Sequence, residues 1–409
     1  MLQAMAAGSV AAGLAACGGP TASGTPAPST PGVPTPSRPV ASLEPSASAG
    51  VSARPTAPAT PEPTSDPATL RAKIGRMLLV GFRGLELHDN DPIAIALAAG
   101  LGGVILFDRD QTTGGKRNIS SPDQLATLTT ALRGVALGPI LIAADQEGGK
   151  VSRLNPAMGF PATRTQAAIG ATDDPEQAHA AGKAMGDTMA AAGIDFDLAP
   201  VVDVNVDPKN PAIGALGRSF SADPSIVAAM AEAEIKGLHE AGVSSAIKHF
   251  PGLGSAAANT DFASVDVTKT WTDAELDPYR TLIGLGIPDA IMSAHILDRR
   301  RDAKAVASLS SVTIDGLLRG QLGWAGVVMT DDLGAVAITD RYTQKEAIAR
   351  AIEAGNDLLT FANQASYVPD LATRVVDIVV GLVASGRITE ARIDESIARL
   401  DLIVARPPD

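Results

Sequence analysis

Residues 248–261 hold the side chains of this chain that are best suited to chemistry. Lys248 and His249 stand side by side where an apolar run ends, and a turn rich in proline and glycine follows them. The segment then closes on Asn259 and Asp261. A cation, an imidazole and a carboxylate around such a turn are typical of a loop that follows a buried strand and faces a ligand.

Ionisable residues also end several other apolar runs, namely Asp145, Asp203, His295 and Asp331. Removing so many charges from water at one rim is unfavourable unless partners or a function retain them. We expect Asp203 and His295 to hold loops in buried pairs. The others are candidates for contact with a ligand.

The elements that must position these residues are eight short, continuously apolar runs. Such runs suit parallel strands that are buried on both faces. With helical patterns between them, they predict an α/β fold, a (β/α)8 TIM-type barrel forming a single catalytic domain over 67–409. A doubly wound open sheet is the alternative, but no Gly-x-Gly-x-x-Gly follows the first strand. The predicted strands are 78–82, 103–107, 140–145, 197–203, 245–249, 290–295, 327–331 and 357–360.

The helices between the strands have recognisable ends. Asp174 and Asp223 each precede a proline, which predicts an N-cap and a first helical residue. Thr343 and Glu346 have the spacing of a capping box. A last helix over about 394–405 places apolar residues on one stripe.

The N-terminal part of the chain is different in kind. Residues 1–17 are small and mostly apolar and end in Leu-Ala-Ala-Cys, which resembles a signal peptide with a bacterial lipobox, although no Lys or Arg precedes the run. Cys17 is the only cysteine, so no internal disulfide can form, and it would carry the lipid. Residues 18–66 are rich in Pro, Ser, Thr and Ala and predict a disordered tether. A lipid-anchored or secreted extracytoplasmic protein is expected.

Composition excludes some classes of partner. The net charge is −12 and the pI near 4.9, which argues against nucleic acid. Aromatic residues make up only 3%, so a sugar site would depend on hydrogen bonds and charge more than on stacking. No His, Cys and carboxylate cluster has metal-ligand spacing, so no metal is expected.

Lys248–Gly254 resembles the Lys-His-Phe-Pro-Gly-x-Gly signature of glycoside hydrolase family 3, in particular its single-domain bacterial β-N-acetylhexosaminidase branch, which acts on peptidoglycan fragments. The resemblance extends over nearly the whole folded region, and together its segments are highly specific. The other matching segments are 79–82, 102–107, 145–154, 197–204, 217–220, 291–295 and 330–333.

The resemblance implies a retaining β-glycosidase without a cofactor. It places the nucleophile at Asp331, with Asp332 as the competing assignment and a helix-start or loop-pairing role expected for the latter. The residues that it implies for binding the sugar are Asp145, Arg153, Arg218, Lys248 and His249. A surface salt bridge is the alternative for Arg153. Lys248 and Arg218 are also expected to lower the pKa of nearby carboxylates.

The acid/base position departs from the branch. Where the branch has Asp-x-His, this chain has Asn259-Thr260-Asp261. In one reading, Asp261 is the general acid and Asn259 orients it. In a second, Asp261 binds substrate in a family 3 glycosidase that takes its acid from elsewhere or acts on another β-sugar, such as a glucoside or xyloside. In a third, the protein is a catalytically weakened sugar-binding lipoprotein.

Two further expectations concern the surroundings of the site. Glu147, Gly148 and Gly149 lie in a strand-to-loop turn, and the glycines are interpreted as backbone clearance for a sugar, because no Gly-Lys-Ser/Thr follows that would make a phosphate cradle. The expected partner is an N-acetylglucosamine-containing glycan, and the branch resembled implies a monomer with a membrane contact only through its lipid.

Overall fold

The computed structural model describes residues 65–404. Contacts divide the chain into units 1–61 and 62–409, and the described residues lie in the second. The predicted signal peptide, the lipidated Cys17 and all but the last two residues of the predicted linker lie outside the described residues.

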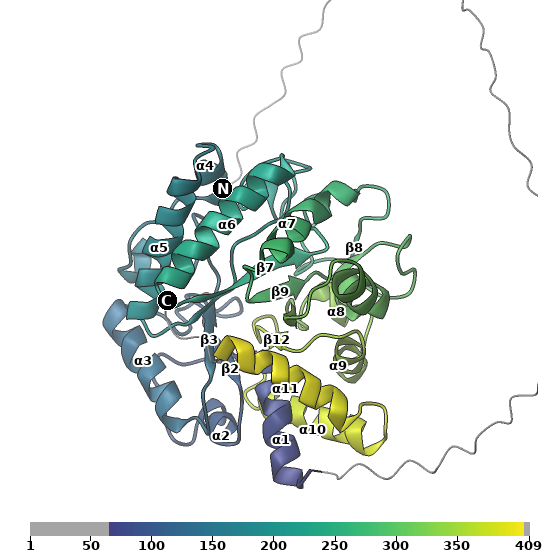
Figure 1. Ribbon diagram of the computed structural model, residues 1–409. Helices are drawn as coiled ribbons and strands as arrows, with labels where there is room; N and C mark the ends of the chain where they lie inside the picture. Colours follow the sequence, from purple (N-terminus) through teal and green to yellow (C-terminus); the bar gives the residue numbers. More distant parts are fainter. Residues whose placement is uncertain (1–64, 405–409) are drawn as a thin grey trace, which may run out of the picture. The chain divides into compact units, whose positions relative to one another are not determined.

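Eight parallel strands form one sheet that curls into a barrel (Figure 1). The two ends of the sheet meet at a parallel bridge between Met329 and Leu358, where the Thr330 amide donates to the Leu358 carbonyl at 3.0 Å. The predicted TIM-type barrel is therefore confirmed. In spatial order the strands are β11 (Val327–Thr330), β9 (Ala290–Ser293), β7 (Ser244–Phe250), β6 (Phe196–Asp197), β3 (Leu141–Ala144), β2 (Gly103–Ile105), β1 (Leu78–Gly81) and β12 (Leu359–Phe361).

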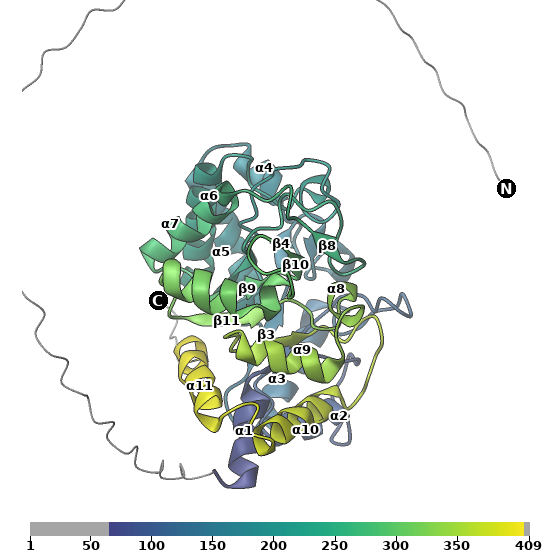
Figure 2. The same ribbon diagram turned by 90° about the vertical axis from the view of Figure 1, so that its right-hand side faces the viewer.

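Helices surround the barrel in both views (Figure 1, Figure 2). They are α1 (Pro67–Arg76), α2 (Pro92–Ala98), α3 (Pro122–Val135), α4 (Gln166–Gly170), α5 (Pro175–Ala191), α6 (Pro224–Glu240), α7 (Asp277–Leu285), α8 (Val336–Thr339), α9 (Gln344–Glu353), α10 (Leu371–Ala384) and α11 (Glu390–Val404). Smaller elements are β4 (Gln146–Gly148), β5 (Val151–Ser152), β8 (Val265–Asp266), β10 (Ile296–Leu297), η1 (Pro156–Met158), η2 (Gly214–Leu216), η3 (Asp273–Leu276), η4 (Ala307–Leu309) and η5 (Val312–Gln321).

All eight predicted strands differ from the observed ones by at least one residue, and two of them, 197–203 and 357–360, differ most. Of the run 197–203 only Asp197 belongs to a strand, β6, after which the chain touches β7 again at a bridge between Val201 and Lys248. The last strand begins at Leu359 instead of 357, although Asp357 still donates its backbone amide to the Val328 carbonyl of β11 at 2.7 Å. Its buried carboxylate accepts hydrogen bonds from Arg319 at 2.7 Å and from Arg399 at 2.9 Å, which tie η5 and α11 to this strand.

The predicted helix starts are largely observed. The carboxylates of Asp174 and Asp223 cap α5 and α6 by accepting backbone N–H groups, and proline follows each of them. The predicted capping box is only half formed. Thr343 Oγ accepts the Glu346 amide at 3.3 Å, but the Glu346 carboxylate accepts from Arg350 instead of reaching back to Thr343. The last helix begins at Glu390, four residues before the predicted start.

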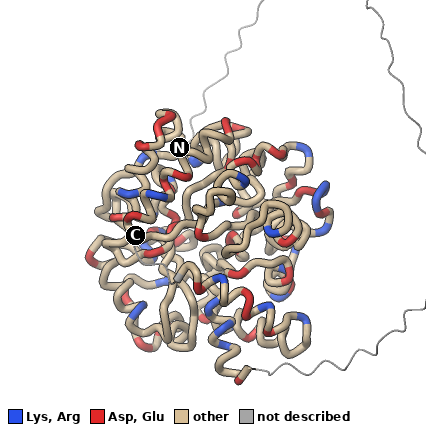
Figure 3. Tube along the Cα trace, in the orientation of Figure 1, with Lys and Arg blue, Asp and Glu red and all other residues tan. Residues whose placement is uncertain are grey.

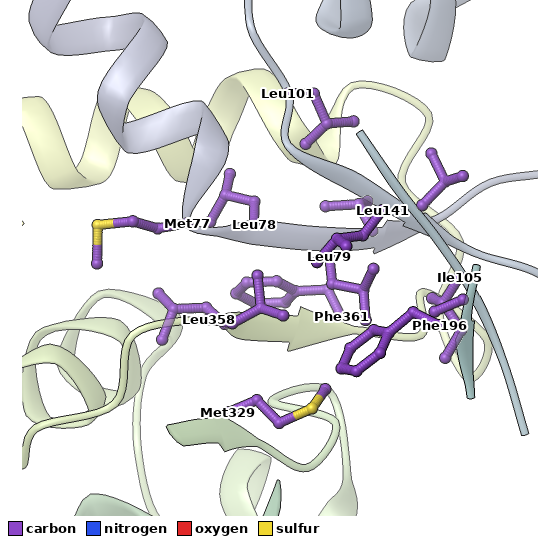
Figure 4. Close-up of a cluster of buried hydrophobic side chains, with 14 of the residues drawn as sticks. Met77, Leu78, Leu79, Leu101, Ile105, Leu141, Phe196, Met329, Leu358 and Phe361 are labelled. Carbon is purple, nitrogen blue, oxygen red and sulfur yellow. The ribbon is translucent and has the colours of Figure 1, made fainter. Parts of the chain in front are cut away.

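The barrel interior is filled by large apolar side chains (Figure 4). Leu79, Ile105, Phe196, Met329 and Phe361 come from five different strands, and each is at most 3% exposed. Continuous apolar runs bury both faces of each strand, one against this interior and the other against the helices. The interior is thus a packed core, and chemistry is restricted to its rim.

Acidic and basic residues are scattered along the described part of the chain, and the trace shows no continuous basic stripe (Figure 3). Within 65–404, no helix combines the length and the apolar character needed to cross a bilayer.

Candidate active site

One pocket gathers the predicted site residues at the carboxyl ends of the barrel strands. Its cavity has a volume of about 290 Å³. Asp145 directly follows β3, Lys248 and His249 lie at the end of β7, and Asp331 directly follows β11. All eight predicted residues of the folded region line it, namely Asp145, Arg153, Arg218, Lys248, His249, Asn259, Asp261 and Asp331.

Lys248 is the centre of a group of paired, largely buried charged residues in this pocket, which we call the buried wall. Its other members are Asp145, Glu147, Arg153 and Arg218. Lys248 is 2% exposed, and its Nζ donates to Asp145 Oδ1 and to Glu147 Oε1, each at 2.7 Å. Burial opposes the charge of the lysine, but these two carboxylates outweigh it and raise its pKa. Lys248 is therefore a fixed cation with one N–H bond left for a ligand, because no third acceptor for it lies within the described residues.

Arg153 completes the environment of Asp145. Its Nη2 donates to Asp145 Oδ2 at 2.8 Å, and its guanidinium lies 5.2 Å from the centre of the Phe107 ring. Burial would raise the pKa of Asp145, but the charges of Lys248 and Arg153 hold it well below its usual range. Arg153 thus forms an ion pair inside the pocket, and the surface salt bridge considered for it is wrong.

Glu147 belongs to the same wall and was missed from the sequence as a site residue. Its side chain is 1% exposed and lies between two cations, Lys248 and Arg218. Arg218 Nε and Nη2 donate to its two oxygens at 2.6 and 2.7 Å. Burial is outweighed by Arg218 and Lys248, which lower the pKa of Glu147 to about 2. The signal was present, since Asp145 and Glu147 are two residues apart and extended chain places such residues on one side.

His249 is oriented by Asp203. Its Nδ1 lies 2.7 Å from Asp203 Oδ2, while Asp203 Oδ1 accepts the backbone amide of Leu253 at 2.7 Å. His249 Nε2 faces Arg218 at 3.4 Å. Asp203 therefore performs the buried loop-holding role expected of it and also fixes the imidazole. His295 is buried and supports the loop after β11, because its Nε2 donates to the Asp332 carbonyl at 2.9 Å.

Asp331 and Asp332 lie next to each other at the end of β11 but have different surroundings. Asp332 Oδ1 accepts the amides of Gly334 and Ala362, each at 2.9 Å, so it pairs two loops as expected. Burial, followed by the charge of Asp331, raises the pKa of Asp332 to about 7. The only hydrogen bond described for the Asp331 carboxylate comes from the Asp332 amide at 2.8 Å, which leaves the group available to a ligand.

Asp261 lines the same pocket as Asp331. Desolvation, followed by the charge of Asp331, raises its pKa to about 6. As a whole residue Asp261 is exposed, so solvent screens part of this effect. Asn259 Oδ1 accepts the backbone amide of Asp261 at 2.8 Å, so Asn259 shapes the turn that carries the carboxyl.

The glycine-rich turn that precedes Asp261 is held by buried side chains. Gly252 has φ 124°, a conformation that suits glycine. The buried Trp271 donates its Nε1–H to the Pro251 carbonyl at 3.1 Å. Glu275, fully buried, accepts the Ser255 amide at 3.3 Å, and burial raises its pKa to about 7.

The interpretation of Gly148 and Gly149 as clearance for a sugar is wrong. Both have positive φ angles, 89° and 60°. A Cβ on Gly148 would lie 2.2 Å from the Arg164 carbonyl oxygen, and one on Gly149 would lie 2.2 Å from Thr165 Cγ2. The glycines are needed because the β4–β5 hairpin packs closely on its own neighbouring chain.

The donor set of the pocket is suited to organic hydroxyl groups. Carboxylates held ionised accept hydrogen bonds, while Lys and Arg donate them. Among residues 65–404, no group of three His, Cys, Asp or Glu side chains is arranged to hold a metal ion.

Several carboxylates paired with or close to cations at the rim of a parallel barrel suit a glycosidase. Comparison with known proteins agrees. The family described as glycosyl hydrolase family 3, N-terminal domain, matches residues 69–403. The chain belongs to glycoside hydrolase family 3 and is a glycoside hydrolase.

Its relatives share a name. A beta-hexosaminidase of Xanthomonas euvesicatoria is 36% identical over 314 residues, which are 75% of this chain and 87% of the relative. One of Alkalilimnicola ehrlichii is 34% identical over 73% of this chain and 84% of the relative.

Solved structures give the same result. The beta-N-acetylhexosaminidase of Beutenbergia cavernae has a TM-score of 0.73 and 31% identity, and covers 82% of this chain and 98% of its own. A family 3 beta-N-acetylglucosaminidase of Paenibacillus has a TM-score of 0.75 and 35% identity over 83% of this chain, but only 64% of that longer chain is spanned.

Proposed function

We propose that this protein is a retaining β-glycosidase that removes terminal β-linked N-acetylglucosamine from cell-wall-type glycans. One observation carries the proposal. Asp331 and Asp261 line one pocket, and Asp261 holds its proton to a higher pH than Asp145 and Glu147 do. A retaining glycosidase needs a carboxylate nucleophile and a second carboxyl that keeps its proton, and the raised pKa of Asp261 suits it to the second role.

In the first step, an Asp331 oxygen forms a bond to the anomeric carbon as the bond from that carbon to the leaving oxygen breaks. Asp261 gives its proton to the leaving oxygen, so that an alcohol departs. In the second step, the Asp261 carboxylate takes a proton from water, whose oxygen attacks the anomeric carbon and releases Asp331. The enzyme returns to its first state and one glycosidic bond has been hydrolysed.

Binding of the sugar is assigned to the buried wall. Asp145 accepts hydrogen bonds from vicinal hydroxyls, while Lys248, Arg153, Arg218 and His249 donate to hydroxyl or acetamido oxygens. Because these groups are already paired with one another, they are held in place before the substrate arrives. The names of the relatives support N-acetylglucosamine as the sugar.

The test is a set of initial rates on two substrates. One is the p-nitrophenyl β-glycoside of N-acetylglucosamine, whose leaving group needs no acid, and the other is the β-linked disaccharide of the same sugar. We expect Asp331→Asn to cleave neither and Asp261→Asn to lose about 10²- to 10⁴-fold on the disaccharide but little on the aryl glycoside. If the wild type cleaves neither, the assignment to N-acetylglucosamine fails, and β-glucosides and β-xylosides must be assayed.

We also propose that the protein is anchored outside the cytoplasm through a lipid on Cys17. The Leu-Ala-Ala-Cys sequence at 14–17 supports this. Metabolic labelling with an alkyne fatty acid should mark the wild type and not Cys17→Ala, and only the wild type should sediment with membranes. Equal labelling of both would contradict the anchor.

A further inference from the structure

Phe262 is an unusual surface residue in this structure. Seven large apolar side chains are exposed in the described residues, and Phe262, 68% exposed, is the only aromatic one. It also lines the candidate active-site pocket, which none of the other six does. The remaining six are Ile95, Leu137, Val206, Leu285, Val312 and Leu402.

The second aromatic residue of the pocket lining does not offer a ring in the same way. Phe107 is 6% exposed, and the guanidinium groups of Arg153 and Arg117 lie 5.2 and 5.6 Å from its ring centre. Phe262 is therefore the aromatic side chain of this pocket whose ring can cover a ligand.

The backbone fixes Phe262 relative to both catalytic carboxylates. The amide of Phe262 donates to the Asn259 carbonyl at 3.1 Å, which closes a tight turn around Asp261. The carbonyl of Asp261 in turn accepts the amide of Val336 at 3.2 Å, at the start of α8. This helix follows Asp331 within the same loop, so the turn and the nucleophile belong to one connected unit.

The position of a general acid determines which part of a substrate its neighbours meet. The acid gives its proton to the oxygen of the leaving group, so it must face that group. With Asp261 as the proposed acid, its neighbour Phe262, which lines the same pocket, is placed at the leaving group, whereas Asp145, Arg153, Arg218 and Lys248 are assigned to the sugar that is transferred.

We propose that Phe262 is a stacking platform for the first sugar ring of the leaving group, an inference that rests on the proposed function. A β-linked pyranose of gluco configuration presents axial C–H bonds on its faces, and burying an exposed phenyl ring under such a face is favourable. The low aromatic content predicted a site that depends on hydrogen bonds and charge more than on stacking, and a single platform at the rim is compatible with that prediction.

The experiment compares two substrates that differ only in what leaves. The disaccharide of N-acetylglucosamine fills the leaving-group site, whereas N-acetylglucosaminyl β-fluoride releases a single atom and does not reach Phe262. For Phe262→Ala, kcat/KM on the disaccharide should fall on the order of 10- to 100-fold more than on the fluoride, as expected for loss of a buried phenyl contact. Phe262→Trp should restore the disaccharide to within about threefold of wild type. Leu285→Ala is the matched exposed control and should change neither ratio.

Four outcomes overturn the proposal. Equal losses on both substrates would mean that Phe262 only supports the fold of the loop. An unchanged disaccharide rate together with a changed elution volume in size-exclusion chromatography would assign Phe262 to self-association. If the wild type cleaves the disaccharide and the fluoride but Phe262→Ala changes nothing, the platform is absent while the proposed function stands. If the wild type cleaves neither, the proposed function fails first, and the platform fails with it.

Discussion

Arg218 donates two hydrogen bonds to Glu147, from Nε to Oε2 at 2.6 Å and from Nη2 to Oε1 at 2.7 Å. The Glu147 side chain is 1% exposed and that of Arg218 13%. A bidentate pair of this kind fixes orientation as well as charge. Because Lys248 also contacts Glu147, one carboxylate balances two cations. The buried wall of the pocket therefore depends on a residue that does no bond making.

Replacing Glu147 should destabilise the protein. Glu147→Gln leaves Arg218 and Lys248 buried with less negative charge, so the free energy of unfolding should fall by about 3 kcal/mol. Glu232→Gln, which disturbs an exposed pair with Lys236 on α6, should change it by less than about 0.5 kcal/mol. Urea unfolding followed by circular dichroism measures both. Equal, small losses in both variants would show that the Arg218–Glu147 pair contributes little to stability.

The pH dependence of catalysis should report Asp261. A general acid must start protonated, and the pKa of this carboxyl is raised to about 6. Above pH 6, kcat/KM on the disaccharide should fall about tenfold per pH unit, and below it the rate should not fall through this group. The β-fluoride needs no proton donor and should lack this descending limb. Asp340→Asn, at the end of α8, serves as the control and should keep the descending limb. If the descending limb also persists in Asp261→Asn, it belongs to another group.

Glu275 should act as a positioning residue for the loop that carries Asp261. The Glu275 carboxyl accepts the Ser255 amide, and Glu275 packs against Gly252 so closely that a Cβ on Gly252 would lie 2.6 Å from the Glu275 Cβ. Glu275→Ala removes the acceptor and the packing, so kcat/KM on the disaccharide should fall at least about tenfold, and by less on the fluoride. Glu275→Gln keeps an acceptor and should stay within about threefold of wild type. A loss in both variants that is equal for both substrates would point to a general folding defect.

Asp197 should give stability a pH dependence of its own. It is fully buried, its Oδ2 has no partner within the described residues, and burial raises its pKa to about 8 from 3.8. Between about pH 4 and 8 the folded protein keeps this proton and the unfolded chain releases it. The contribution is therefore complete below pH 4 and is lost as the pH rises through this window, by about 1.4 kcal/mol per unit.

The comparison that isolates this effect uses Asp197→Asn, which is neutral at every pH. Its free energy of unfolding should decline less than that of the wild type between pH 5 and 7.5, while Asp187→Asn on the exposed surface of α5 should follow the wild type. Denaturant titrations at several pH values give the curves. Parallel curves for wild type and Asp197→Asn would contradict the assignment.

The positions of the barrel strands and of several helix starts could be predicted from the sequence. Continuous apolar runs predicted the barrel strands, and Asp-Pro pairs at 174 and 223 located two helix starts, because hydrophobic periodicity and capping act over a few residues. The details failed where other side chains compete for a partner. The Glu346 carboxylate accepts from Arg350 instead of completing the capping box, and the buried Asp357 carboxylate accepts from Arg319 and Arg399, two distant residues that no local pattern indicates.

The composition of the site was also accessible, since charged residues directly after apolar strands meet at one rim. Only the tertiary structure decided how these residues act on one another. Lys248 reaches Asp145 across 103 residues of chain, and Asp261 acquires its high pKa from burial and from Asp331 on another loop. Charge interactions and desolvation depend on distance through space, which the order of residues does not contain. The sequence therefore specified the residues, and folding set the pKa shifts of Asp145, Glu147, Lys248 and Asp261.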